Sequence, residues 1–459
     1  MLTPLEPWIR SKIGLPPTLP LSRSALQDYQ LSRLQATVDY VRNHSRFYRR
    51  RLAGINAAEL RRPEDVSRLP FTTPADIVEN DGSFLCSSQS EIERVVTLQS
   101  SGTTNRPKRL HFTASDLELT VDFFHHGMST FVKPGDRVLV LMPGELPGSV
   151  GDLLLQGLAR MGAVGIVHGI VRDERAAIAG IISQKIDCLV GLPVQLLALI
   201  RHPEACEIPH GRIKSVLLSA DYVPVAIVRE IERSWGCPVF NHYGMTETGL
   251  GGAVDCRART GCHIREADLL VEIVDPATGQ PVPDGEPGEL VFTTLTRSGM
   301  PLIRYRSGDL SRFIPEPCPC GTILKRLAWI WGRLAGQVKL GGNDLLNMAD
   351  LDEALFPLPG LLNFQAALTE EDGVDVLSVS LFTRGGSAEK LCRSTWEALA
   401  AIPAVQKASA TGKLRIAPPA IAENNWQSSG SVKRTLHDRR ENNHADELAG
   451  ADRVRSAEE

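Results

Sequence analysis

The sequence predicts an α/β fold, with layered sheets and helices in a large N-terminal domain and a small, mobile α+β domain after it. The chain has 459 residues, which exceeds one typical domain. Between Ser115 and Arg212, apolar helical stretches alternate with short β-like runs, a pattern typical of largely parallel sheets. Beyond residue 334 the chain combines a helical segment with a long strand-like run.

The amino-acid composition and the N-terminal sequence argue against several classes of protein. A net charge of −4 gives no basic surface for nucleic acid or an anionic membrane. No apolar run reaches the ~18 residues of a membrane helix, and the N-terminus lacks the basic and apolar regions of a signal peptide. We therefore expect a cytoplasmic protein whose nine cysteines are mostly reduced, so that clustered cysteines indicate metal binding rather than disulfides.

The first elements are a helix and a strand. Apolar spacing at Leu26, Leu34 and Val38 predicts one helix from Ser22 to Leu52. The apolar run Val95–Leu98 predicts a strand that ends at a polar loop. The loop consists of Ser100, Ser101, Gly102, Thr103, Thr104, Asn105, Arg106, Pro107 and Lys108. Its first five residues are four hydroxyl residues and a glycine.

This loop has the residue types of an anion site. Glycine allows close approach, successive N–H groups and hydroxyls can surround phosphate oxygens, and Lys108 adds a positive charge. It is not a P-loop, because no Gly-Lys-Ser/Thr follows. For the loop alone, a polar surface turn is the alternative interpretation.

The central strands lead to further polar residues. We expect strands over residues 138–142, 164–167, 188–192, 213–219 and 238–240, and then over 269–274 and 289–294. Asn241, Tyr243 and Gly244 follow one of these strands, at the end of the sheet where α/β proteins bind ligands. Farther on, a helix over 348–356 and a strand over 374–381 are expected. We predict domains over 1–334 and 335–440, with a charged, disordered tail over 441–459.

Four motifs follow the polar loop in a fixed order. They are Tyr243-Gly244-Met245-Thr246-Glu247, Arg304-Tyr305-Arg306-Ser307-Gly308-Asp309, Gly332-Arg333 and Lys339-Leu340-Gly341-Gly342. With the loop, this succession resembles the ANL superfamily of adenylate-forming enzymes, and within it the phenylacetate-CoA ligase-like branch. The resemblance covers nearly everything from Leu31 to Arg440. It implies an adenylate-forming N-terminal domain and a hinge just past Arg333. The usual acidic hinge residue of the family is missing here, and Gly336 could supply the same backbone freedom.

The resemblance assigns roles around ATP. It implies that Asp309 binds both ribose hydroxyls and that Tyr243 lies against the adenine, with Asn241 or Ala220-Asp221 near its edge. Gly244 and Met245 belong to the same nucleotide site. Thr246 would contact the α-phosphate, Glu247 would help to hold Mg²⁺, and Arg333 would reach the ribose or phosphate. Taken singly, Asp309 could be a turn carboxylate and Glu247 a charge at a helix N-terminus.

The acid and the acceptor follow from the branch. An aromatic carboxylic acid is implied, held near Met142, Pro143, Gly144, Tyr222, Gly249 and Gly251. Coenzyme A or an acyl carrier protein would accept the acyl group, and the resemblance allows a homodimer. Transfer to an amine or hydroxyl is an alternative, as is a degenerate protein that binds nucleotide or acid without turnover.

The C-terminal lysine motif also departs from the family pattern. The family has a catalytic lysine in a Gly-Lys-x-x-Arg phrase near its C-terminus, whereas this chain has Ser429-Gly430-Ser431-Val432-Lys433-Arg434. Ser431 thus stands where lysine is expected. Lys433 lies two residues later and can serve only if the segment shifts; in an extended segment these two positions share a face.

Cysteines form two tight groups. Cys256, Cys262 and His263 follow the Tyr-Gly-Met-Thr-Glu motif, and Cys318-Pro319-Cys320-Gly321 follows Asp309. A structural zinc site needs four sulfur or nitrogen ligands, and similar family members carry a Cys/His zinc site here. We predict that Cys256, His263, Cys318 and Cys320 bind Zn²⁺, with Cys262 as the substitute ligand. Separate buried thiols are the alternative.

Overall fold

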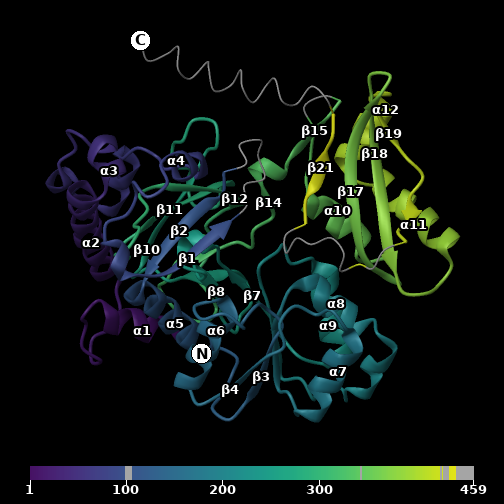
Figure 1. Cartoon of the computed structure of the whole chain (residues 1–459), viewed down its shortest axis with the longest axis horizontal. Helices are drawn as coiled ribbons and strands as arrows, with labels where there is room; N and C mark the ends of the chain where they lie inside the picture. The colour runs from purple at the N-terminus through teal and green to yellow at the C-terminus, as the bar shows by residue number, and fades with distance from the viewer. Residues whose placement is uncertain (99–105, 342–343, 424–425, 427–433, 441–459) are drawn as a thin grey trace. The chain divides into compact units, whose positions relative to one another are not determined.

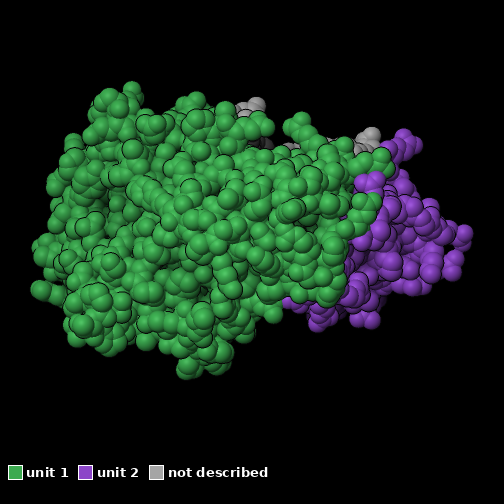
Figure 2. Space-filling view, turned by 90° about the horizontal axis from the view of Figure 1, so that it is seen from below, with its two compact units in different colours: residues 1–192, 207–220, 235–331 green, residues 193–206, 221–234, 332–459 purple. Residues whose placement is uncertain are grey.

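The computed structural model describes residues 1–98, 106–341, 344–423, 426 and 434–440. The chain divides into two compact units, coloured separately in Figure 2. Unit 1 contains residues 1–192, 207–220 and 235–331, and unit 2 contains residues 193–206, 221–234 and 332–459. No helix among the described residues has both the length and the apolar character needed to cross a bilayer.

The main sheet of unit 1 has eight strands in the described residues, and the five neighbouring strands at one end of the sheet pair in parallel (Figure 1). In spatial order they are β13 (Arg326–Leu327), β9 (Cys262–Ile264), β8 (Ala253–Asp255), β7 (Val239–Tyr243), β6 (Ser215–Leu218), β5 (Cys188–Gly191), β3 (Arg137–Val140) and β4 (Val164–Val167). Strands β3 to β7 pair in parallel, and β7, β8, β9 and β13 pair antiparallel. All side chains of β5 and β6 are buried, as expected for strands covered on both faces.

Two smaller antiparallel groups complete unit 1. Strands β1 (Ile92–Leu98) and β2 (Lys108–Thr113) form a ribbon, so that Lys108 begins β2. Strands β10 (Leu269–Val274), β11 (Gly288–Thr294) and β12 (Tyr305–Ser311) pair in sequence order. The predicted mixed α/β architecture with several sheets is confirmed.

Helices surround these sheets. Those of unit 1 are α1 (Leu5–Lys12), α2 (Arg23–His44), α3 (Arg46–Arg51), α4 (Pro74–Glu79), α5 (Ala114–Met128), α6 (Val150–Arg160) and α7 (Glu174–Ser183). Short 3-10 turns are η1 (Ala57–Glu59), η2 (Pro63–Arg68), η3 (Gln89–Glu91) and η5 (Thr246–Thr248). The prediction of one helix over 22–52 is wrong at Ser45, which is extended and accepts a hydrogen bond from the Tyr48 backbone N–H, so that it ends α2 and caps α3.

Unit 2 is built around the long hairpin of β17 (Leu361–Glu371) and β18 (Val374–Thr383) (Figure 1). Strands β19 (Leu414–Ile416) and β20 (Ala420–Ile421) pair with β18, and β21 (Leu436–Asp438) pairs with β17, all in parallel. The remaining elements are α8 (Pro193–Ile200), η4 (Pro203–Glu207), α9 (Val225–Trp235), β14 (Gly332–Arg333), η6 (Leu334–Gly336), β15 (Val338–Leu340), β16 (Asp344–Leu346), α10 (Met348–Leu355), α11 (Ala388–Ala400) and α12 (Pro403–Ala410).

Candidate active site and metal centre

Two side chains from distant parts of the sequence converge on the Glu247 carboxylate in unit 1. Lys108 forms a close ion pair with the Oε1 atom of Glu247, and the Tyr305 hydroxyl donates to the same oxygen at 3.0 Å. Lys108 Nζ also lies 3.2 Å from the Tyr305 hydroxyl. Glu247 is almost fully buried in η5. The first residue of β2, the turn η5 and the first residue of β12 thus meet at one point.

Electrostatics keep this carboxylate ionised. Burial acts to raise the pKa of Glu247, but the Lys108 charge and the hydrogen bonds to Lys108 and Tyr305 hold that pKa below its ordinary value. Burial and the charge of Glu247 both raise the pKa of Tyr305, so its hydroxyl stays protonated and remains a donor. The cluster therefore presents one cation and one anion side by side in a water-poor place.

A second pair of predicted residues lies at β12. The Tyr243 hydroxyl, at the end of β7, donates to the Oδ2 atom of Asp309 at 2.9 Å. Glu289 of β11 pairs with Leu310 and Val291 with Arg306, so β12 carries two extra residues here. Gly308 within this bulge has φ of 73°, a conformation that glycine adopts without strain. The bulge sets the position from which Asp309 meets Tyr243.

Other residues predicted to bind the nucleotide lie at or just after the carboxyl ends of β6 and β7 in the main sheet. Ala220, which follows β6, has φ of 73°, an uncommon conformation for a residue with a side chain. The backbone N–H of Asn241 donates to Asp255. A Cβ atom on Gly244 would lie 2.3 Å from the Leu250 carbonyl oxygen, so only glycine fits there. Thr246 begins η5 and Met245 precedes it. Ser100, Ser101, Gly102, Thr103 and Thr104 lie outside the described residues.

The residues predicted to hold the acid have mixed surroundings. Met142 is buried in the core and Pro143 is exposed. A Cβ atom on Gly144 would lie 2.7 Å from Val167, and one on Gly251 would lie 2.4 Å from the Phe123 ring. Gly249 has φ of 74°. Close packing and backbone conformation therefore already require three of these residues to be glycine.

His242 lies among these residues and was not predicted from the sequence. Its ring centroid is 6.0 Å from that of Phe123 and 6.1 Å from that of Phe124, and its Nδ1 atom is 2.8 Å from Ser219 Oγ. Burial, aided by the charge of Arg265, lowers the pKa of His242 to about 4. The residue precedes Tyr243 in the motif, but nothing in its spacing indicated an uncharged imidazole.

The predicted residues Asp221, Tyr222 and Arg333 belong to unit 2. Arg333 is exposed. The Tyr222 hydroxyl donates to Glu353 at 2.8 Å, and the backbone N–H of Tyr222 donates to Asp221. Lys433 lies outside the described residues.

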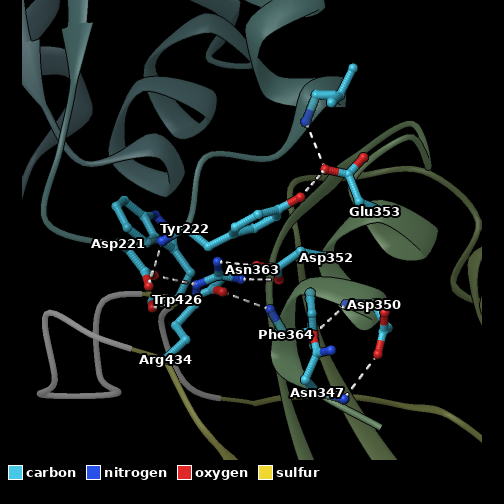
Figure 3. A network of polar contacts seen from close by, with 11 residues as sticks. Asp221, Tyr222, Asn347, Asp350, Asp352, Glu353, Asn363, Phe364, Trp426 and Arg434 are labelled. Carbon is cyan, nitrogen blue, oxygen red and sulfur yellow. Dashed lines mark hydrogen bonds and ion pairs between the residues drawn. The ribbon is translucent and has the colours of Figure 1, made fainter. Parts of the chain in front are cut away.

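Arg434, the residue after Lys433, is at the centre of the network in Figure 3. It donates two hydrogen bonds to Asp352, at 2.6 and 2.7 Å, and one to Asp221 at 3.1 Å. The rings of Phe356 and Phe364 lie 4.9 and 5.7 Å from its guanidinium carbon. Burial works against this charge, but Asp352 and Asp221 hold the pKa of Arg434 above its ordinary value.

The structure brings together the four residues predicted to bind zinc. One ligand atom from each of Cys256, His263, Cys318 and Cys320 lies within 4.8 Å of the others, and all four residues are buried. The Sγ atoms of Cys256 and Cys318 are 3.6 Å apart, and Cys320 Sγ is 3.5 Å from His263 Nε2. Three sulfurs and one imidazole nitrogen form the donor set of a Cys₃His zinc site, which these residues fit.

The alternative ligand Cys262 faces elsewhere. Its Sγ atom lies 3.6 Å from Asp255 Oδ1 and 3.5 Å from the Asn241 carbonyl oxygen. Burial, then the charge of Asp255, raises the pKa of Cys262 well above its ordinary value, so it is a neutral thiol. Because Cys262 and His263 are neighbours in β9, their side chains point to opposite faces, and His263 is the one that reaches the cluster.

Comparison with known proteins places the chain in a family. Residues 72–296 match the model of the AMP-binding enzyme family. The chain is 30% identical to a phenylacetate-coenzyme A ligase of Thermus thermophilus over 77% of its length and 81% of the relative's. It is 29% identical to the phenylacetate-coenzyme A ligase of Escherichia coli, over 80% of its length and 84% of the relative's.

Solved structures share the fold. The 2-hydroxyisobutyryl-CoA ligase in its postadenylation state, in complex with R3-HIB-AMP, gives a TM-score of 0.76 at 21% identity, with 96% of both chains covered. The anthranilate CoA ligase AuaEII in complex with anthranoyl-AMP gives 0.54 at 15% identity, over 81% of this chain and 70% of that one. By sequence and fold, this chain belongs to the AMP-binding enzyme family, in its phenylacetate-CoA ligase-like branch.

Proposed function

We propose that this chain activates a carboxylic acid with ATP to an acyl-adenylate and then transfers the acyl group to coenzyme A. The observation that carries the proposal is the meeting of Lys108, Glu247 and Tyr305 in one buried cluster. The Tyr243–Asp309 pair lies nearby in the sequence of elements, since Asp309 is on β12 with Tyr305 and Tyr243 ends β7 shortly before η5. Membership of an AMP-forming ligase family supports the same reaction.

Each residue of the site has a task in this reaction. In the first step a carboxylate oxygen of the acid attacks the α-phosphorus, and the bond to pyrophosphate breaks. Lys108 offsets the negative charge on the phosphates, and Asp309 accepts hydrogen bonds from the two ribose hydroxyls. In the second step the thiolate sulfur attacks the acyl carbonyl carbon, and the bond to AMP breaks. Thr246 lies beside Glu247 and would orient the α-phosphate.

Two metals belong to the proposal. Glu247 would help to hold Mg²⁺, whose preferred ligands are oxygens, and the ion would neutralise phosphate charge when bound. Cys256, His263, Cys318 and Cys320 would hold a structural Zn²⁺ outside the chemistry.

The substrates are proposed more finely from the relatives. Those that match over most of the chain are named phenylacetate-coenzyme A ligases, which favours an aromatic acid. The aromatic rings of Phe123 and Phe124 beside Gly251 suit such an acid. A carrier protein as acceptor, a homodimer, a cytoplasmic location, and Lys433 as the displaced catalytic lysine stay predictions.

Acid-dependent exchange of pyrophosphate into ATP tests the first step. Phenylacetate and a panel of aryl acids should support exchange, and coenzyme A should then give the thioester. Asp309→Ala should lower exchange by ~10²–10³, because a contact in a water-poor site is lost. Exchange without acid dependence, or near-normal exchange by Asp309→Ala, would contradict the proposal. Acyl transfer to amines or hydroxyls but not to coenzyme A would favour the alternative function, a ligase whose acceptor is not a thiol.

A further inference from the structure

The turn that carries Glu247 is held by side chains from α5 and from the loops that follow β9 and β11. Its successive carbonyl oxygens, at residues 247, 248 and 249, each accept a hydrogen bond. Arg297 Nη1 donates to the first at 3.0 Å, Arg265 Nη2 donates to the second, and Thr120 Oγ1 donates to the third at 2.7 Å. The turn therefore relies on fixed donors around it and not only on its own hydrogen bonds.

Arg297 differs from the other two donors, because it also binds the strand that carries Lys108. Its Nη2 atom donates to the His111 carbonyl oxygen at 3.2 Å. His111 lies in β2, whose first residue is Lys108. The guanidinium carbon is also 4.3 Å from the centre of the Phe112 ring in the same strand. One planar cation thus bridges the backbones on both sides of the Lys108–Glu247 pair.

This arrangement is costly for a merely structural link. Arg297 is only 8% exposed. The nearby Asp116 carboxylate accepts hydrogen bonds from the backbone N–H groups of Ser298, Gly299 and Thr113 and from the Ser298 hydroxyl, not from Arg297. Burial lowers the pKa of Arg297, and Asp116 and Glu247 oppose that shift only in part. Among the described residues no carboxylate accepts a hydrogen bond from Arg297, and such a buried cation is expensive to keep charged.

We propose that Arg297 is a positioning residue, which fixes the distance between Lys108 and Glu247 by binding the backbone of both elements. The inference rests on the proposed function, since the pair it positions is the one assigned to ATP. A shift of ~1 Å in a reacting group can lower a rate by ~10²-fold. Lysine keeps the charge but cannot donate to both carbonyls from one rigid plane.

Pyrophosphate exchange with a double-mutant cycle tests this role. Arg297→Lys should lower kcat by ~10²-fold and leave KM for the acid nearly unchanged. In a Lys108→Met background, the same substitution should change the residual rate by less than ~3-fold, because the pair it positions is already lost.

Arg265→Lys is the matched control. Arg265 is a similarly buried arginine that binds the same turn, but its other hydrogen bond goes to Leu119 of α5 and not to β2. Urea unfolding of each variant measures the structural cost. The control should show a comparable loss of stability, and its effect on exchange should be as large in the Lys108→Met background as in the wild type.

Two outcomes would overturn the inference separately. If Arg297→Lys lowers exchange by the same factor in both backgrounds, the residue is only structural, and normal wild-type exchange leaves the proposed function intact. If none of the tested acids supports pyrophosphate exchange by the wild-type protein, the proposed function fails and this inference fails with it.

Discussion

The surroundings of His242 determine the protonation state of its imidazole. Its imidazole lies between Ser219 and two phenylalanine rings, and its Nε2 atom is inaccessible to solvent. A proton on this ring would be buried near the positive charge of Arg265. The folded protein therefore favours the neutral imidazole, and its hydrogen-bonding role depends on that state.

The pKa of His242 predicts a loss of stability in mild acid. It is about 4 in the folded protein and 6.5 ordinarily, so between these values the unfolded chain binds a proton that the folded protein does not. The contribution of the neutral His242 ring to the free energy of unfolding is therefore fully present above pH 6.5. It is lost as the pH decreases toward 4, by about 3 kcal/mol in all. Urea unfolding across this range measures the effect.

His242→Asn supplies the comparison. Between pH 6.5 and 4, the free energy of unfolding of the variant should change less steeply with pH than that of the wild type. The difference in slope should correspond to about one bound proton. His44→Asn, which changes an exposed histidine of α2, should keep the wild-type dependence. Equal slopes for the wild type and His242→Asn would show that the imidazole is not held neutral.

At the scale of elements, local patterns predicted the position of most strands. Apolar runs such as 188–192 and 213–219 became β5 and β6 because buried parallel strands need continuous apolar sequence. The break at Ser45 was missed, because the apolar spacing continues while a hydroxyl cap interrupts the backbone. The bulge at Gly308 depends on pairing with β11, which sequence spacing does not reveal.

The site itself was only partly predictable. Lys108 and Glu247 stood in motifs, but they are 139 positions apart, and their direct contact follows from the fold. Tyr305 was within a motif, yet its donation to Glu247 depends on how β12 passes η5. The contacts of Arg297 and His242 cross from one element to another, and no local pattern marks such contacts.

The metal cluster joins two neighbouring strands of the main sheet to a long loop. His263 comes from β9, Cys256 follows β8, and Cys318 and Cys320 lie in the loop between β12 and β13. The backbone N–H of Cys320 donates to Cys318 Sγ, and that of Ala258 donates to Cys256 Sγ, as suits thiolates. A bound zinc would fasten this loop to the edge of the main sheet.

Removing one ligand should therefore weaken the fold more than the chemistry. Metal analysis should give about one zinc per chain, and Cys320→Ser should lower both zinc content and melting temperature, because binding energy at such sites is folding energy. Cys206→Ser, at an exposed cysteine, is the matched control.

A second group tests the assignment of the metal. Asp122, His125 and His126 of α5 also lie within 4.8 Å of one another, but they are partly exposed and include no sulfur. His126→Ala should leave zinc content unchanged. If zinc is lost from His126→Ala and kept by Cys320→Ser, the Cys₃His assignment is wrong.

At the scale of the molecule, unit 2 is assembled from separate stretches of the chain. It takes residues 193–206 and 221–234 as well as those from 332 onward. The predicted domains were continuous stretches, 1–334 and 335–440, and that division stays a prediction. Sequence patterns identify elements, whereas the grouping of α8 and α9 with β17 depends on contacts between distant residues, such as that of Arg201, just after α8, with the Leu361 carbonyl oxygen in β17.

Arg434 links two of these stretches, because Asp221 lies in residues 221–234 and Asp352 lies with Arg434 in the stretch from 332 onward. Arg434→Met should destabilise unit 2 by about 3–5 kcal/mol, because it leaves two carboxylates without their buried counter-charge. Hydrogen exchange at β17 and β18 measures the change. Arg393→Met removes an exposed pair with Glu389 on α11 and should cost less than about 0.5 kcal/mol.

A second substitution separates lost charge from lost packing. Asp352 is completely buried, so in the Arg434→Met protein its carboxylate has no partner of opposite charge within the described network. Asp352→Asn in that background should recover part of the lost stability, since a neutral amide is cheaper to bury than a carboxylate. If Asp352→Asn instead lowers stability further, the contribution of Arg434 comes from its packing on Phe356 and Phe364 rather than from its charge.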